Sequence, residues 1–334
     1  MTDNIDKEFL LDKYKKMKTI REFENQAIEL AKQNLTRAAI HTYNGEEAIA
    51  VGVCASLDND DYITSTHRGH GHCVAKGADL VRMFAELMAR ENGYCKGKGG
   101  SMHIADLDIG MLGANGIVGG GIPIATGAAL AKKIQKEKGI VVCFFGDGAS
   151  NEGAFHESLN FAGVLKLPIV YLCENNQYGI STHVSNSTAA KHISERAIGY
   201  GMPGKTIDGN DILTVYKEFK EVAEYVRSGN GPVLLEMDTY RMSGHYFGDN
   251  ENYRTRDEVA EWKKRDPIKK CSQYLVEDYG MEYSDFDSID KEIKEEILLA
   301  SAEAKRGPEP NPEDLENDIY DPTFEEIEWK AWAK

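Results

Sequence analysis

The chain has 334 residues, of which 41% are hydrophobic and 28% charged, and its formal net charge at pH 7 is -16. Nucleic acids and anionic membranes attract basic surfaces, so this charge argues against either as a partner. No stretch approaches the ~20 apolar residues of a membrane span, and residues 1–6 lack the apolar core of a signal peptide. We therefore expect a cytoplasmic protein with one large domain and an appendage.

Helical and strand patterns alternate along the chain, as in a doubly wound, mostly parallel α/β sheet flanked by helices. Apolar residues at helical spacing predict helices over residues 7–35, 46–57, 80–91 and 215–227. Pro123, after three glycines, predicts the first turn of an alanine-rich helix over residues 124–138. Apolar runs predict buried strands over residues 140–145, 169–173 and 232–237.

The character of the sequence changes near residue 266. From there the chain is strongly acidic, helical in pattern over residues 290–305, and punctuated by Pro308, Pro310 and Pro312. We therefore predict an α/β domain of residues 1–265 and a helical carboxyl-terminal extension of residues 266–334, packed on that domain or on a partner.

Two of the predicted strands end in side chains that carry oxygen ligands. Asp147, in Gly146-Asp147-Gly148, follows the first, and Asn175-Asn176 follows the second. The 26 residues between them, 149–174, suffice for a crossover helix and a return strand. A right-handed βαβ unit would bring Asp147 and Asn176 together at the carboxyl ends of neighbouring strands, where α/β sheets bind ligands. One carboxylate and one amide oxygen suit a Mg²⁺ ion that keeps its other positions for phosphate oxygens and water.

Two similar phosphate-binding motifs fit this segment less well. A P-loop would need Lys and then Ser or Thr where Ala154 and Phe155 stand. A dinucleotide fingerprint beginning at Gly146 would need a glycine or alanine at the position of Asn151. Each half of the motif alone could also be an ordinary turn, so the joint spacing carries the prediction.

The Gly-Asp-Gly and Asn-Asn pair resembles the thiamin diphosphate signature, and its context resembles the alpha subunits of the first component of 2-oxo acid and acetoin dehydrogenase complexes. Further segments follow the order of that family: residues 41–48, 65–72, 97–103, 115–119, 239–241 and 253–256. Within the family, the sequence looks most like those of acetoin dehydrogenase alpha subunits. The resemblance implies the thiamin diphosphate-binding α/β fold.

The resemblance also implies roles for individual residues. Asp147, Asn176 and Tyr178 would hold Mg²⁺. The cofactor itself would contact His67, Arg68, Gly116, Val118, Gly148, Ala149 and His245, with His67 and Arg68 at its diphosphate and the backbone of Gly116 and Val118 at its aminopyrimidine ring. His41 and His245 match active-site histidines of the family, and the latter supports acyl transfer there.

The residues themselves leave alternatives open at several of these positions. His67, His70 and His72 could converge on zinc, but Arg68 would repel a cation, and guanidinium with imidazole suits a diphosphate. A solvated loop is the other alternative there. The glycine-rich stretch 113–121 is either a plain flexible loop or a set of amides that approach a ligand ahead of a helix.

The two remaining histidines are equally open on the sequence alone. His245 lies in a loop rich in glycine and charge, where it is an exposed bystander or a proton-transfer group that titrates near neutrality. His41 is a core histidine or an active-site one. Tyr246 follows His245 where some relatives carry a phosphorylated serine, so we expect no control by that serine kinase.

The resemblance implies a cofactor shared between two subunits, and this chain is patterned for the diphosphate-binding domain alone. A beta subunit would then supply the glutamate that activates the pyrimidine, in an assembly of two alpha and two beta chains. The acetyl group from a small-molecule substrate would pass to lipoamide on a lipoyl-bearing acyltransferase.

We predict acetoin as the substrate, cleaved to acetaldehyde and the acetyl group, with a pyruvate dehydrogenase alpha subunit as the alternative. Two departures from the family pattern put the shape of the pocket in doubt: Glu46 stands where glutamine is usual, and Leu165 where many relatives have tryptophan. A split transketolase-like subunit and a non-catalytic scaffold subunit are remoter alternatives.

Overall fold

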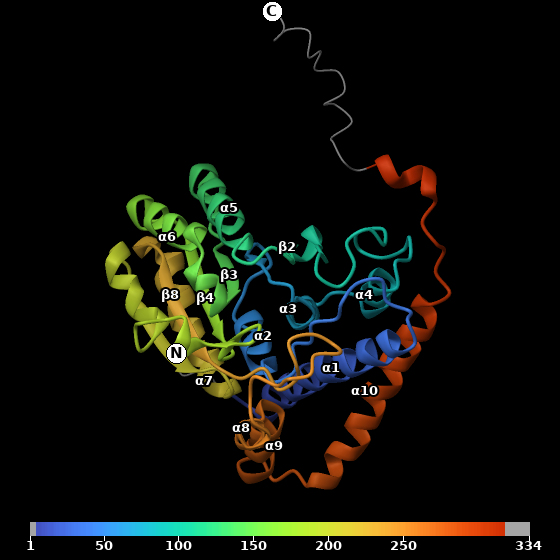
Figure 1. Cartoon of the computed structure of the whole chain (residues 1–334). Coiled ribbons are helices and arrows are strands. Elements are labelled where there is room, and N and C mark those ends of the chain that lie inside the picture. Colours follow the sequence, from blue (N-terminus) through green and yellow to red (C-terminus); the bar gives the residue numbers. More distant parts are fainter. Residues whose placement is uncertain (1–4, 318–334) are drawn as a thin grey trace, which may run out of the picture.

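The computed structural model describes residues 5–317 and contains a six-stranded parallel sheet with helices on both faces (Figure 1). The strand order is β2-β1-β3-β4-β8-β7, and every neighbouring pair is parallel. These strands are β1 Tyr62–Thr64, β2 Met111–Gly113, β3 Val141–Gly146, β4 Ile169–Asn175, β7 Gly204–Asp208 and β8 Val233–Asp238. A small antiparallel pair, β5 Tyr178–Gly179 and β6 Thr182–His183, follows β4. The predicted fold class is confirmed.

The α-helices of the described residues alternate with these strands. They are α1 Lys7–Lys32, α2 Glu47–Cys54, α3 His70–Lys76, α4 Leu80–Leu87, α5 Gly121–Gln135, α6 Gly153–Leu165, α7 Ile212–Tyr225, α8 Arg256–Lys263, α9 Pro267–Glu277 and α10 Tyr283–Ala304. Because successive side chains of a strand point to opposite faces, β3 and β4 fill two cores. Val142 and Phe144 join the core with α1, α2 and α7, whereas Cys143 and Phe145 join the core with α5 and α6.

The predicted strand-helix-strand unit is present as β3, α6 and β4, with Gly146 opposite Glu174 in the register. The helix expected at residues 124–138 starts earlier, at Gly121, which places Pro123 inside its first turn. The first four N–H groups of a helix have no partner within it, so a proline there costs no hydrogen bond. The sequence patterns did not predict the short strands β1, β2 and β7 or the helix α3.

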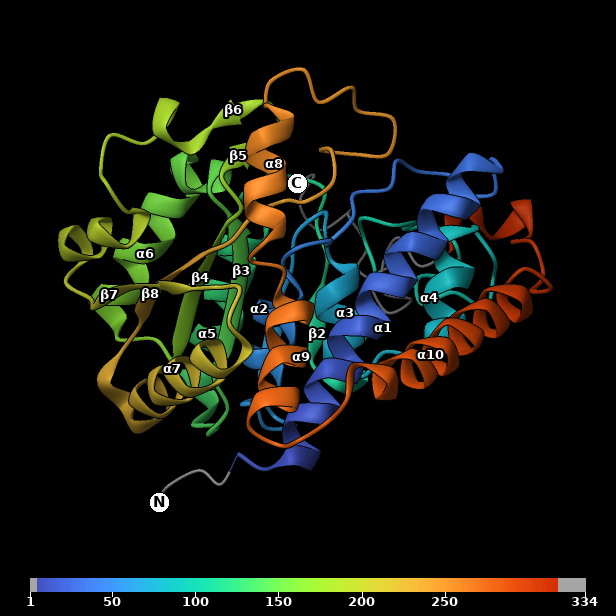
Figure 2. The same cartoon turned by 90° about the horizontal axis from the view of Figure 1, so that it is seen from below.

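The carboxyl-terminal helices lie against the amino-terminal part of the chain (Figure 2). Helix α9 contacts α1 and α2, and α10 contacts α1 and α4. Ile293, Ile297 and Ala304 of α10 are buried in the same core as α1. The domain boundary at residue 265 stays a prediction, and residues 318–334 of the predicted extension lie outside the described residues, as do residues 1–4.

None of the helices within residues 5–317 combines the length and the apolar character needed to cross a bilayer.

Candidate active site

A cavity of about 310 Å³ opens at the carboxyl ends of β3 and β4, where parallel α/β sheets bind ligands. Segments that are distant in the sequence line it together. Among the predicted residues, its lining includes His67, Arg68, Val118, Asp147, Gly148, Ala149, Asn176, Tyr178 and His245. Gly116 and His41 do not line the cavity. Gly116 lies between Asn115 and Ile117, which do, and the ring of His41 lies next to His67 and His245.

Asp147 leaves β3 with its carboxyl group pointing into this cavity. The residue is 2% exposed, and its Oδ2 atom has no hydrogen-bond partner among the described residues. Burial raises the pKa of Asp147 to about 6. A buried carboxylate oxygen without a partner is unfavourable unless a cation or donor meets it, so the residue fits a bound metal ion.

Asn176 is held in place by a residue that departs from the family pattern. Its Nδ2 atom donates to Glu46 Oε1 at 3.0 Å, and its Oδ1 atom accepts from the Tyr178 N–H at 3.4 Å. Glu46 is buried, and burial together with the nearby Glu174 carboxylate raises its pKa well above the usual value. Glu46 therefore acts on the site through Asn176, whereas Leu165, the last residue of α6, packs against the core and is absent from the cavity lining.

Tyr178 offers the site its backbone rather than its ring. The hydroxyl donates to both carboxylate oxygens of Glu258, at 2.9 and 3.0 Å. The carbonyl oxygen accepts from Arg241 Nη1 at 3.1 Å. A carbonyl oxygen has two lone pairs, so one remains for a cation beside Asp147 and Asn176.

Two buried guanidinium groups give one side of the site a positive charge. Arg68 donates from Nη1 to the Thr42 carbonyl at 2.9 Å and from Nη2 to the His245 carbonyl at 2.8 Å. Arg241 is 1% exposed and lies next to His245. Within residues 5–317 neither guanidinium forms an ion pair with a carboxylate. Their positive charge therefore suits an anion such as a diphosphate in the cavity.

Three histidines gather beside these guanidinium groups. The ring of His41 lies 4.9 Å from that of His67 and 5.0 Å from that of His245, between centroids. Burial, with the Arg68 charge second, lowers the pKa of these histidines to about 4, 2 and 3 for His41, His67 and His245 respectively. All three imidazoles are therefore neutral near pH 7, and His245 is a half-buried member of the site rather than an exposed bystander.

The zinc interpretation of the histidine-rich segment is wrong, because His70 and His72 use both ring nitrogens elsewhere. His70 pairs with Glu24 and Ser101, each at 2.9 Å. His72 pairs with Ser65 at 2.7 Å and Glu174 at 3.0 Å. These buried residues lie at the start of α3, where His70 ties it to α1 and His72 ties it to β4, and residues 65–68 line the cavity.

The glycine-rich segment reaches the rim of the cavity just before α5. Val118 is exposed and lines the cavity, and Gly119 has a φ of +75° that a side chain would disfavour. The Gly116 N–H donates to His103 Nε2 at 3.4 Å, while His103 Nδ1 contacts the Gly99 carbonyl at 3.0 Å. His103 therefore ties residues 97–103 to this loop.

We predicted no role for Arg241, although residues 239–241 are among the segments that carry the family resemblance. Arg241 also donates to the Ile180 carbonyl at 2.8 Å and to the Tyr253 hydroxyl at 2.7 Å. It thereby fixes the turn that carries Tyr178. The signal in the sequence was an arginine three residues after a buried strand, at the end where the site lies.

Comparison with known proteins identifies the family. The sequence model of the dehydrogenase E1 component family matches residues 15–313. The chain is 49% identical to the alpha subunit of the acetoin:2,6-dichlorophenolindophenol oxidoreductase of Bacillus subtilis, over 92% of each chain. It is 44% identical to the protein of the same name from Cupriavidus necator, over 95% of each chain. It is 37% identical to the pyruvate dehydrogenase E1 component subunit alpha of Rhizobium meliloti, over 94% of this chain and 90% of the other. The chain therefore belongs to the dehydrogenase E1 component family, which implies thiamin diphosphate as its cofactor.

Proposed function

We propose that this chain is the alpha subunit of a thiamin diphosphate-dependent acetoin dehydrogenase. The enzyme would cleave acetoin to acetaldehyde and transfer the acetyl group to lipoamide on an acyltransferase. The observation that carries the cofactor assignment is the buried, unpartnered Oδ2 atom of Asp147 beside Asn176. The choice of acetoin rests on the names of the relatives at 49% and 44% identity, against 37% for a pyruvate dehydrogenase subunit.

The residues around the cavity divide between the two ends of the cofactor. Asp147, Asn176 and the Tyr178 carbonyl would hold Mg²⁺, and Arg68, His67 and His245 would hold the diphosphate. The backbone of Gly116, Val118, Gly148 and Ala149 would lie against the cofactor. When bound, thiamin diphosphate supplies the carbon nucleophile that attacks the substrate carbonyl.

His245 is arranged to present a proton at a defined atom. Its Nδ1 atom lies 3.0 Å from Arg68 Nη2 and 3.4 Å from Arg241 Nη1, and arginine only donates. Nδ1 must therefore accept, which leaves the proton of the neutral ring on Nε2. An imidazole fixed in this tautomer can donate a hydrogen bond to phosphate or substrate oxygen, and His41 packs behind it.

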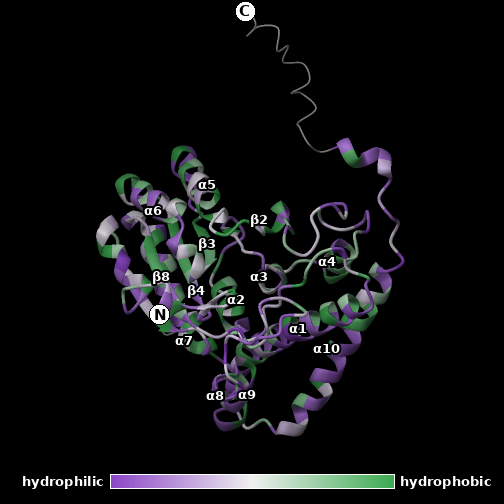
Figure 3. Ribbon diagram, viewed as in Figure 1, coloured by the Kyte–Doolittle hydropathy of each residue, from purple (hydrophilic) through white to green (hydrophobic). Residues whose placement is uncertain are grey.

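Exposed apolar side chains on α5 and α6 support the expectation of a beta subunit. Ile124 and Ile134 of α5, and Phe161 and Val164 of α6, are large and exposed on two adjacent helices, which carry hydrophobic colouring in Figure 3. Contiguous exposed apolar residues mark interaction sites. We assign this surface to a beta subunit that completes the pyrimidine end of the site, within two alpha and two beta chains that serve a lipoyl-bearing acyltransferase in the cytoplasm.

The proposal is tested by reduction of an artificial electron acceptor. The chain would be co-expressed with its beta subunit and supplied with thiamin diphosphate, Mg²⁺ and either acetoin or pyruvate. We expect faster turnover with acetoin, and none by the chain alone. Preference for pyruvate would make it a pyruvate dehydrogenase subunit, activity only on sugar phosphates would favour the transketolase-like alternative, and inactivity with cofactor unbound would favour the scaffold alternative.

A further inference from the structure

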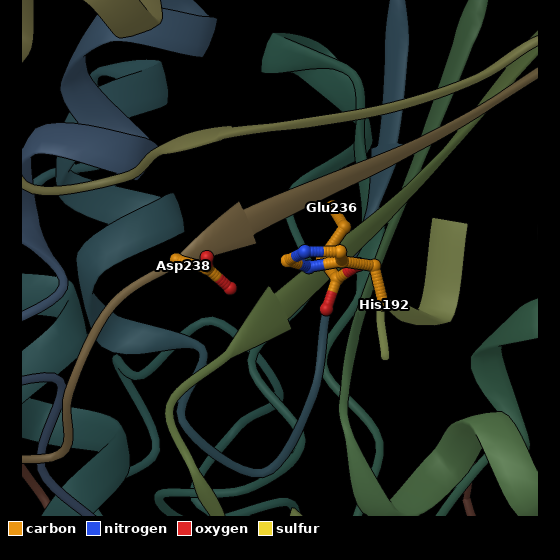
Figure 4. A group of neighbouring side chains, drawn as sticks. All are labelled: His192, Glu236 and Asp238. Carbon is orange, nitrogen blue, oxygen red and sulfur yellow. The ribbon is translucent and has the colours of Figure 1, made fainter. Parts of the chain in front are cut away.

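A second polar cavity, of about 390 Å³, lies at the carboxyl ends of β4 and β8. Its lining includes Asn175, His192, Asp208 and Asp238. Glu236 and Asp238 are two residues apart on β8, so both side chains point to the same face of the sheet. His192 comes from the loop just before η4 (Ile193–Tyr200), and its ring faces the same space as the two carboxylates (Figure 4).

These three side chains bring metal-ligating atoms close together. One ring nitrogen of His192 and one carboxylate oxygen each of Glu236 and Asp238 all lie within 4.8 Å of one another. Zn²⁺ bonds of ~2.0–2.2 Å would place adjacent ligand atoms about 3.3 Å apart, so a closure of up to about 1.5 Å is needed. His192 and Asp238 are partly exposed and can turn, whereas Glu236 is buried and held in place.

The hydrogen bonds of Glu236 fix its side chain and leave it room for a metal. Oε1 accepts from Asn175 Nδ2 at 2.8 Å, and Oε2 accepts from the Ser194 N–H at 3.0 Å and the Thr206 hydroxyl at 3.1 Å. The two oxygens of a carboxylate offer about four acceptor positions, so one position, on Oε1, remains, and Oε2 would exchange one of its hydrogen bonds to bind an ion beside His192. The fixed carboxylate is thus a preorganised ligand.

The protein offsets the negative charges of this cluster only in part, through His192 and the more distant Arg265. Within residues 5–317, no lysine or arginine lies within ion-pair distance of Glu236 or Asp238, and the only pairing is His192 Nδ1 to Glu236 Oε2 at 3.9 Å. Arg265 lines the cavity, but its Nη2 atom pairs with Asp208 at 3.1 Å and its guanidinium lies over the Trp262 ring. Lys191 also lines the cavity and is exposed. Two carboxylates next to one imidazole, one of them 0% exposed, call for a cation.

We propose that His192, Glu236 and Asp238 form a binding site for a divalent transition-metal ion of the Zn²⁺ type, distinct from the Mg²⁺ site at Asp147. An imidazole with two carboxylates suits such an ion, and water would complete its coordination. The ion would fasten the segment before η4 to the end of β8. Because Asn175 donates to Glu236 and adjoins Asn176, the ion would also stiffen the turn that carries the cofactor-site asparagine.

Calorimetric titration with Zn²⁺ tests the proposal on the assembled alpha and beta complex. The complex is first dialysed against a chelator and then loaded with thiamin diphosphate and Mg²⁺, which occupy the His41, His67 and His245 cluster. We expect one Zn²⁺ per alpha chain, with affinity lowered at least about 10-fold in both His192→Ala and Asp238→Asn, since each removes a ligand.

Two matched variants locate the binding. His156→Ala removes an exposed histidine of α6, and His67→Ala removes an imidazole of the cofactor site; both should keep the Zn²⁺ uptake. Thermal denaturation followed by circular dichroism should show that Zn²⁺ raises the Tm of the wild type and of His156→Ala, but not of His192→Ala. No Zn²⁺ uptake by the wild type, uptake that either ligand variant keeps, or uptake lost in His67→Ala would overturn the proposal.

Discussion

His245 shows how a buried site controls a single ionisable group. Burial acts first and the guanidinium groups of Arg68 and Arg241 act next, and together they lower its pKa to about 3. An imidazole with a lowered pKa stays neutral until the pH falls well below its usual titration range. The unfolded chain would take up that proton near pH ~6.5, so this residue destabilises the fold as the pH falls below that value.

In the cofactor-free chain, we expect the Cε1 proton resonance of His245 in the NMR spectrum to show no titration between pH 8 and pH 5. Binding of thiamin diphosphate places negative oxygens beside the ring and should move its pKa upward. His245→Gln, which deletes the resonance, assigns it. A midpoint between pH 6 and 7 in the cofactor-free chain would contradict this account of the site.

Local motifs identified those residues of the site that belong to a short, recognisable stretch of sequence. Asp147 and Asn176 were predicted to meet because each directly follows a recognisable buried strand. Arg241 was missed because its contacts to Tyr178 and Ile180 lie about 60 residues away in the sequence. The zinc alternative failed for the same reason: Glu24 and Glu174, which occupy His70 and His72, come from distant elements.

At the scale of elements, one buried carboxylate organises the loop that follows α4. Glu86 is 0% exposed and accepts hydrogen bonds from the N–H groups of Cys95, Gly97, Gly99 and Gly100, at 2.7 to 3.0 Å. The loop carries no strand or α-helix of its own, so this side chain takes the place of regular secondary structure.

Glu86→Ala should lower the free energy of unfolding by about 3 kcal/mol, because it leaves several N–H groups without a partner. Urea denaturation measures this loss, and limited trypsin digestion should cut residues 93–103 faster. Glu91→Ala, an exposed neighbour, is the matched control and should change neither. A variant at position 86 as stable as the Glu91 control would show that water replaces the carboxylate.

Asp211 joins α7 to α9 and gives this contact a dependence on pH. Its Oδ1 atom caps α7 by accepting from the Leu213 and Thr214 N–H groups, and its Oδ2 atom meets Lys270 Nζ at 3.0 Å and the Tyr274 hydroxyl at 2.9 Å. Burial acts to raise the pKa of Asp211, but the hydrogen bond and charge of Lys270 outweigh it and the pKa is lowered. A carboxyl with a lowered pKa stabilises the fold above the unfolded pKa of ~3.9, and that contribution is lost as the pH falls through the folded value.

Asp211→Ala should reduce the free energy of unfolding by about 1 to 2 kcal/mol at pH 7, since it removes a helix cap. Asp211→Asn keeps the cap and should lose less, and its difference from the wild type should shrink as the pH falls below about 4. Urea denaturation at pH 7, 4 and about 3 gives these values. An equal trend in a Lys270→Ala background would contradict a role for Lys270, whose Nζ atom lies 3.0 Å from Asp211 Oδ2.

Long periodic segments were predictable as elements, and short ones were not. The helices α1 and α7 and the strands β3, β4 and β8 lie within a few residues of the predicted ranges, because each repeats its pattern over several turns or alternations. Strands β1 and β2 have three residues each. Strand β1 pairs with β3, more than 75 residues further along, and β2 pairs with β1, and no local pattern records these distant pairings. Helix α5 starts at Gly121, the last residue of the glycine run, rather than at Pro123.

At the scale of the whole molecule, one parallel sheet places both cavities at the carboxyl ends of its strands. The first lies at the ends of β3 and β4 and the second at the ends of β4 and β8, with Asn175 and Asn176 between them. The fold class followed from alternating helices and strands, and the family from motif order. What the sequence could not provide is which apolar residues of α5 and α6 are exposed on the two packed helices, the surface that we assign to a partner.

The central claim, that Asp147 anchors a metal-bound diphosphate cofactor, is tested most directly by calorimetric titration of thiamin diphosphate into the assembled alpha and beta complex with Mg²⁺ present. We predict that Asp147→Asn, with assembly unchanged by size-exclusion chromatography, binds the cofactor at least about 100-fold more weakly than the wild type, since an amide cannot replace the carboxylate as a Mg²⁺ ligand at the same strength. Equal affinity of the two complexes would contradict the account, because the buried carboxylate would then play no part in holding the cofactor.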